Sequence, residues 1–131
     1  MEKLIITAAI CGAEVTKEHN PSVPYTVTEI GEEAEKAYKA GASIIHLHVR
    51  EDDGTPTQSK DRFEACMAEI KRRCPDVIIQ PSTGGAVGMT NAERLQPVDL
   101  SPEMATLDCG TCNFGGDEVF TNTENTIKEF G

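Results

Sequence analysis

Apolar residues along this chain follow two alternating patterns. Short apolar runs of strand length stand at 4–9, 43–49, 77–80 and 104–108. Each run is followed by a loop and then by a segment in which apolar side chains recur at helical spacing, at about 28–41, 60–73, 90–95 and 123–130. Strands that alternate with helices in this way predict parallel βαβ units.

Four such units give an α/β fold with half the strands of an eight-stranded TIM (β/α)8 barrel. We therefore expect residues 1–131 to form a single domain, the N-terminal half of such a barrel. An open half-barrel leaves unpaired backbone groups on its outer strands. We expect these edges to be covered either by a second copy, in a homo-oligomer, or by the other half of a longer protein.

Two histidines, His46 and His48, stand in the second predicted strand. Side chains at i and i+2 of a strand point the same way and lie roughly 6.5–7 Å apart along it, so both rings can bind one metal ion. The opposite face of the strand is wholly apolar (Ile45, Leu47 and Val49). A strand that becomes polar toward its C-terminal end is typical of the active mouth of a barrel. The alternative is that these histidines have ordinary core or surface roles.

Polar residues and glycines also follow the later strands. Ser82, Gly84 and Gly85 come directly after the third predicted strand, where a hydroxyl and backbone N–H groups can approach an anion. A tight structural turn is the simpler interpretation of the same residues. Thr106 and Asp108 share one face of the fourth predicted strand and are candidates for substrate contact.

The net charge of −10 gives little support to binding of nucleic acid or of anionic membrane surfaces. No apolar run approaches the roughly 20 residues that cross a bilayer, and the N-terminal segment lacks a signal-peptide pattern. We expect a cytoplasmic protein. Arg50, two residues after His48, is a candidate partner for an acidic side chain.

The chain has five cysteines, an odd number without the spacing of a disulfide framework, so we expect reduced thiols. Cys109 and Cys112 form a CxxC motif. A structural zinc site needs a second ligand pair, and none is evident; a redox motif is expected to open a helix just after the first strand. We interpret these two cysteines as ordinary small residues at a strand end.

Four segments of the chain together resemble the β-keto acid cleavage enzyme family, and the resemblance extends over essentially all of it. These segments are Thr7-Ala8-Ala9-Ile10-Cys11-Gly12-Ala13-Glu14, Ile44-Ile45-His46-Leu47-His48-Val49-Arg50, Pro81-Ser82-Thr83-Gly84-Gly85 and Met104-Ala105-Thr106-Leu107-Asp108. The resemblance implies a zinc-dependent TIM barrel about twice as long. Such an enzyme exchanges carbon units between a β-keto acid and acetyl-CoA and yields acetoacetate and a new acyl-CoA.

The resemblance also implies roles for individual residues. His46 and His48 match zinc ligands, and Glu14 and Ser82 match catalytic residues that contact the substrate. Gly85 belongs to the loop that binds the substrate carboxylate, and Thr106 supplies a polar group at the end of the fourth strand. The third zinc ligand, a glutamate, and the catalytic arginine and aspartate are expected from the C-terminal half of the family's barrel.

Two other functions stay open from the sequence. A non-catalytic half-barrel module would pair its strand edges with another chain. Another metal-dependent aldolase or hydrolase is equally compatible with the histidine pair, since two histidines define a metal site and not a reaction.

Overall fold

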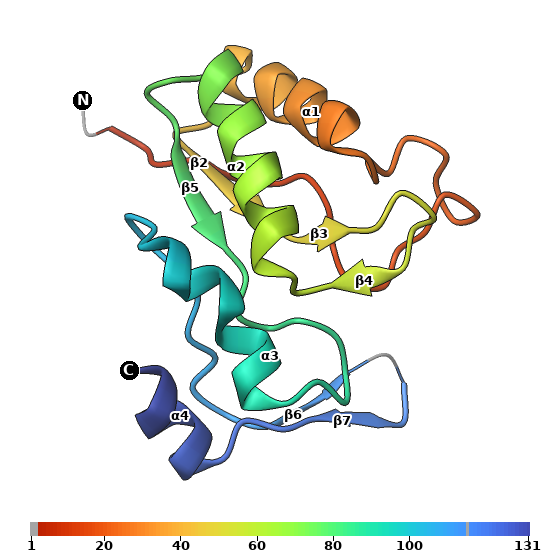
Figure 1. Ribbon diagram of the computed structural model, residues 1–131, viewed down its shortest axis with the longest axis vertical. Helices are drawn as coiled ribbons and strands as arrows, with labels where there is room; N and C mark the ends of the chain where they lie inside the picture. The colour runs from red at the N-terminus through yellow and green to blue at the C-terminus, as the bar shows by residue number, and fades with distance from the viewer. Residues whose placement is uncertain (1–2, 115) are drawn as a thin grey trace.

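The computed structural model describes residues 3–114 and 116–131, whose arrangement Figure 1 shows. Three of the four predicted strands form one parallel sheet. These are β1 (Thr7–Ala9), β2 (Ile44–Leu47) and β5 (Ile78–Pro81), in the order β1-β2-β5. The register places His46 between Ala9 and Gln80. The fold is the parallel α/β arrangement of a partial barrel.

Helices α1 (Val27–Lys39) and α2 (Lys60–Arg73) pack side by side against this sheet (Figure 1). The α1 helix begins slightly before the predicted Thr28. Thr26 is the N-cap and forms a capping box with Glu29, because each side chain accepts a hydrogen bond from the other residue's backbone N–H. The α2 helix has the predicted bounds, with Ser59 as its N-cap.

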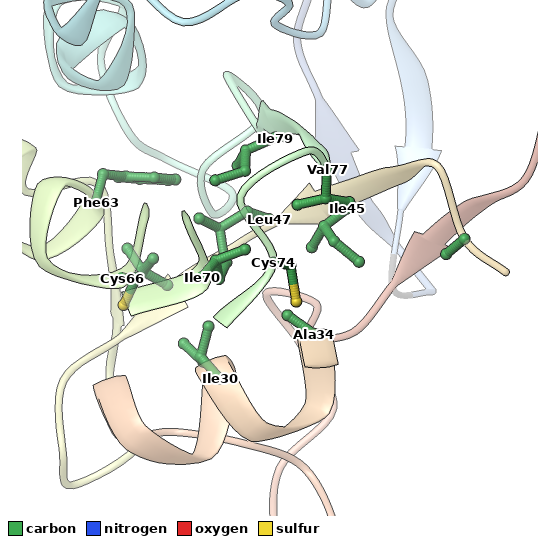
Figure 2. Packing of buried hydrophobic residues seen from close by; sticks show 12 residues of the cluster. Ile30, Ala34, Ile45, Leu47, Phe63, Cys66, Ile70, Cys74, Val77 and Ile79 are labelled. Carbon is green, nitrogen blue, oxygen red and sulfur yellow. The ribbon is translucent and has the colours of Figure 1, made fainter. Parts of the chain in front are cut away.

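The core lies between the two helices and the outer face of the sheet. Figure 2 shows that Ile30 and Ala34 of α1 point toward Ile70 of α2 and toward Cys74, the C-cap of that helix. Ile45 and Leu47 from β2 are fully buried in the same cluster, as the alternation within this strand predicted. Burying one face of β2 leaves His46 and His48 on the opposite face.

Two short hairpins were not predicted. Strand β3 (Val49–Arg50) pairs with β4 (Pro56–Thr57), and β6 (Cys112–Phe114) pairs with β7 (Glu118–Phe120), both antiparallel. The first hairpin continues β2 beyond the histidines. The second lies near the C-terminal helix in Figure 1.

The predicted fourth strand, Met104–Asp108, is not formed, and this prediction was wrong. The segment has no strand ladder; threonine side chains join it to the loop that follows β5. The Thr83 N–H donates to Thr106 Oγ1 at 2.9 Å, and Thr83 Oγ1 donates to the Thr106 carbonyl at 2.8 Å. Threonine hydroxyls here take the place of the backbone groups that a ladder would pair.

The remaining elements follow β5. Helix α3 (Asn91–Leu95) continues into the 3-10 helix η1 (Gln96–Leu100), and α4 (Glu124–Phe130) ends the chain. Thr90 and Thr123 are the N-caps of α3 and α4. Within the described residues, no helix combines the length and the apolar composition that crossing a bilayer requires.

Candidate functional site

His46 and His48 lie on the same side of the chain at the C-terminal end of β2, as the strand spacing predicted. Their ring centroids are 5.1 Å apart and the ring planes meet at 73°. His46 belongs to β2, whereas His48 stands between β2 and β3. The pair therefore presents ring nitrogens from one short segment held by the sheet.

His48 is partly buried, and this lowers its pKa from 6.5 to about 4. Burial is the main cause, and the electrostatic interactions of His48 with His46 and Arg50 add to it. A low pKa keeps the imidazole of His48 neutral at physiological pH. Neutral imidazole is the form of histidine that binds metal ions.

His46 has a partner on the neighbouring strand. Its Nδ1 lies 3.0 Å from Oε1 of Gln80, the residue beside it in the β2–β5 register. The hydrogen bond joins two half-buried side chains and fixes the direction of the imidazole ring.

The loop after β5 is held rigidly at its backbone. Ser82 is buried, and its Oγ accepts a hydrogen bond from the Gly84 N–H at 3.0 Å. Gln58 donates to the Ser82 carbonyl at 3.0 Å, and Arg94 donates to the Thr83 carbonyl at 2.8 Å. Since the Ser82 oxygen already accepts from Gly84, its hydroxyl proton is available for a ligand.

Both the backbone conformation and the close packing around position 85 require glycine there. Its φ is +65°, and a Cβ there would lie 2.8 Å from Met89 Sδ and 3.2 Å from Gln58 Cγ. The left-handed conformation and the close approach both favour glycine. The loop is therefore a tight turn that needs glycine at position 85, and the same turn lines the cavity.

Glu14 lies in the loop after β1, and Arg50 holds that loop in place. Arg50 is almost fully buried, and it donates to the carbonyls of Gly12, Val15 and Gly54. The expected acidic partner of Arg50 is not found among the described residues. The Glu14 side chain is exposed and makes no hydrogen bond with another described residue, so its carboxylate is free to meet a ligand.

A second buried guanidinium, that of Arg94, supports the other side of the site. It donates to the Thr83 carbonyl and to Asn122 Oδ1, and it lies over the rings of Phe120 and Phe130 at 4.7 and 4.8 Å. Burial lowers the pKa of Arg94, while the nearby charge of Asp108 opposes this effect. The hydrogen bonds of Arg94 link α3 to the segment that follows β7.

All seven site residues predicted from the sequence line one cavity of about 360 Å³. They are Glu14, His46, His48, Ser82, Gly85, Thr106 and Asp108. Four different segments thus meet at the C-terminal ends of the parallel strands, where barrel enzymes have their active sites. The two histidines also line an adjoining cavity of about 390 Å³.

Phe114, Phe120 and Cys112 line the same cavity, although no sequence pattern marked them as site residues. Phe114 and Phe120 come from the unpredicted β6–β7 hairpin, and their ring centroids are 5.7 Å apart. Gln80 was also missed. Its signal was present, since it is the polar residue that a parallel register sets beside His46.

The CxxC motif does not end a strand, because Cys112 begins β6 and Cys109 precedes it. Both are exposed free thiols. Within residues 3–114 and 116–131, no three His, Cys, Asp or Glu side chains are grouped as a metal site. The candidate metal ligands of the described part are therefore the two histidines.

The chain belongs to the family of beta-keto acid cleavage enzymes, whose family model matches residues 3–131. It is 82% identical over 131 residues to a 3-keto-5-aminohexanoate cleavage enzyme of Fusobacterium nucleatum subsp. nucleatum and 79% identical over 130 residues to that of Acetoanaerobium sticklandii. These alignments cover 100% and 99% of this chain and 48% of each relative. The chain thus spans about half the length of these curated relatives.

A more distant relative is the 3-oxoadipate:acetyl-CoA acetyltransferase of Cupriavidus necator. It is 44% identical over 110 residues, which are 84% of this chain and 38% of that protein. Among solved structures, a ternary complex of ObcA with a C4-CoA adduct and oxalate matches with a TM-score of 0.71. At 24% identity, over 83% of this chain and 28% of ObcA, this match supports the fold alone.

Proposed function

We propose that this chain forms part of a zinc-dependent enzyme that cleaves a β-keto acid by carbon-unit exchange with acetyl-CoA, giving acetoacetate and a new acyl-CoA. The observation that carries the proposal is the gathering of Glu14, both histidines and Ser82 in one cavity at the C-terminal ends of parallel strands. Membership of the family and the activity in the names of its relatives support it.

His46 and His48 would hold the metal. Their rings converge from one side of the chain, and the low pKa of His48 keeps that ring neutral, so the pair fits a zinc ion. A bound zinc ion would supply Lewis-acid polarisation of the substrate carbonyl. The third protein ligand would come from a segment outside these 131 residues.

The loop after β5 would bind the carboxylate of the β-keto acid. Ser82 has a hydroxyl proton free for donation, and the backbone at Gly84 and Gly85 leaves room for close approach of an anion. Buried hydrogen bonds from Gln58 and Arg94 hold this backbone before the substrate arrives. A preorganised loop loses little conformational entropy on binding. Thr106 and Asp108 would line the far side of the bound substrate.

Glu14 would recognise a positive charge on the substrate. Its carboxylate is exposed at the cavity and lacks a partner among the described side chains, so an ammonium group is a suitable ligand. The relatives of 82% and 79% identity act on an amino-substituted keto acid, according to their names. We therefore propose 3-keto-5-aminohexanoate as the substrate.

The test compares this substrate with 3-oxohexanoate, which lacks the amine, by following acyl-CoA formation in the full-length protein. We expect the amine to raise kcat/KM at least tenfold, and the advantage to shrink in Glu14→Gln. Glu18→Gln, on the same loop but outside the cavity, is the control. No acyl-CoA from any β-keto acid would contradict the proposed reaction. Equal use of both substrates would contradict the role of Glu14 alone.

We propose the cytoplasm as the location of this activity, because the five cysteines are free thiols. The same strand edges would support a non-catalytic module, but such a module needs no polar cavity at its strand ends. The cavity therefore favours the enzyme.

A further inference from the structure

We propose that Gln80 is a positioning residue that fixes the tautomer of His46, so that Nε2 of this ring is the atom that binds a metal ion. The proposal rests on the metal-binding role proposed above for the histidine pair. It goes beyond that role because it names a further residue, the ring nitrogen used and the interaction that selects it.

The first step is the register of the sheet. Gln80 lies directly beside His46 in the parallel pairing of β5 with β2. The flanking residues Ile79 and Pro81 are buried, so the backbone that carries Gln80 is held on both sides. The amide is therefore placed by two packed strands and not by a loop.

The second step is the hydrogen bond itself. Gln80 Oε1 lies 3.0 Å from His46 Nδ1. An amide oxygen only accepts hydrogen bonds, so Nδ1 must carry the proton. Nε2 of the neutral ring then keeps its lone pair, which is the donor that a metal ion requires. A hydrogen bond to the non-ligating nitrogen is the usual way in which proteins orient a metal-binding histidine.

The third step is a contrast within the same chain. Nδ1 of the exposed His19 accepts a hydrogen bond from the Thr16 backbone N–H at 3.2 Å. An accepting Nδ1 has no proton, so neutral His19 has its proton on Nε2. The structure thus assigns opposite tautomers to His46 and His19, and one spectrum can compare the two.

The experiment is ¹⁵N NMR of imidazole nitrogens in the metal-free, full-length protein at a pH above 8. Single histidine-to-asparagine variants assign the signals. We expect a protonated Nδ1 for His46 and a protonated Nε2 for His19. Gln80→Leu, which has similar size and no acceptor, is expected to shift His46 toward the Nε2–H form and to leave His19 unchanged. Gln80→Glu keeps the acceptor and is expected to restore the Nδ1–H form.

A second measurement is the affinity for cobalt, followed by its visible absorption. We expect Gln80→Leu to weaken binding about 10- to 100-fold, as loss of such a supporting hydrogen bond does in other metal sites. Gln80→Glu is expected to stay within about threefold of wild-type. The control is Gln96→Leu, because Gln96 accepts from the Lys60 backbone N–H away from the cavity.

The outcomes separate this inference from the proposed function. If His46→Ala and His48→Ala do not weaken cobalt binding, the metal site itself is wrong. If those variants abolish binding while Gln80→Leu binds cobalt like wild-type, only the role of Gln80 is wrong. An Nε2–H tautomer of His46 in the wild-type protein would also contradict the role of Gln80. Should Gln80→Leu fail to fold, the wild-type tautomer and Gln80→Glu still decide the matter.

Discussion

Arg50 binds the carbonyl oxygen of Gly12 with two of its nitrogens, Nε at 3.2 Å and Nη2 at 2.8 Å. The two residues are far apart in sequence, and the contact joins β3 to the loop that carries Glu14. A buried positive charge is thus satisfied by backbone carbonyls. The same guanidinium that anchors the loop also helps to lower the pKa of His48.

Replacement of Arg50 by Met is expected to destabilise the fold by about 2–3 kcal/mol, because several carbonyls lose a charged donor. Arg50→Lys retains the charge but lacks the planar fork, so it is expected to recover only part of this stability. Urea unfolding measures both variants. Arg72→Met, which removes only an exposed ion pair with Glu69, is the control and should have little effect. Equal effects at Arg50 and Arg72 would contradict the anchoring role.

The pKa of His48 predicts a pH-dependent stability. This pKa is about 4 in the folded protein and 6.5 as the ordinary value, so the unfolded chain takes up the proton first as pH falls. Stability from neutral His48 is complete above pH 6.5 and is lost progressively toward pH 4. Urea midpoints of metal-free protein across this range measure the effect. His48→Gln should show a shallower loss, and identical slopes would contradict the shifted pKa.

Glu29 is expected to stabilise the loop and helix before the site. Its hydrogen bond with Lys17 is the main cause that lowers its pKa to about 2, and backbone N–H groups of Thr26 and Tyr25 add to this. Glu29→Ala breaks the capping box and should cost about 1 kcal/mol. Glu33→Ala loses only a surface pair with Lys36 and should cost about 0.3 kcal/mol. Thermal unfolding compares the two, and equal losses would contradict the cap's contribution.

Gly85 and Gly88 form a matched pair for the loop after β5. Both have positive φ, +65° and +91°, but only at Gly85 would a Cβ approach Met89 and Gln58 closely. Gly85→Ala is therefore expected to raise KM for the β-keto acid at least tenfold, whereas Gly88→Ala suffers only backbone strain of about 1 kcal/mol. Steady-state kinetics of the full-length protein decide this. The same KM for both variants would argue against a binding role of the turn at Gly85.

Local rules explain what the sequence could predict. Residues two apart on a strand share a face, so the convergence of His46 and His48 followed from their spacing and from the apolar Ile45 and Leu47 between and beside them. Ser82 was selected because it follows the third predicted strand, and Glu14 was selected through the family resemblance. Both line the cavity of the histidines, since the ends of parallel strands meet at one edge of a sheet.

Partners distant in sequence explain what could not be predicted. Thr83 and Thr106 exchange hydrogen bonds through their hydroxyls, and nothing in the apolar pattern of 104–108 reveals that these bonds take the place of a strand ladder. Arg50 was a candidate partner for an acidic side chain, but its guanidinium donates to loop carbonyls instead. Thr83 and Thr106, like Arg50 and its carbonyl partners, come within hydrogen-bond distance only once the chain has folded.

The metal content of the full-length protein tests the central claim most directly. After gentle purification, elemental analysis is expected to find about one zinc ion per chain in the wild-type protein and in His19→Ala, whose histidine is exposed on a loop. His46→Ala and His48→Ala should each contain almost none and should retain their circular dichroism. Wild-type protein without a divalent ion, or full zinc occupancy in both variants, would contradict the account.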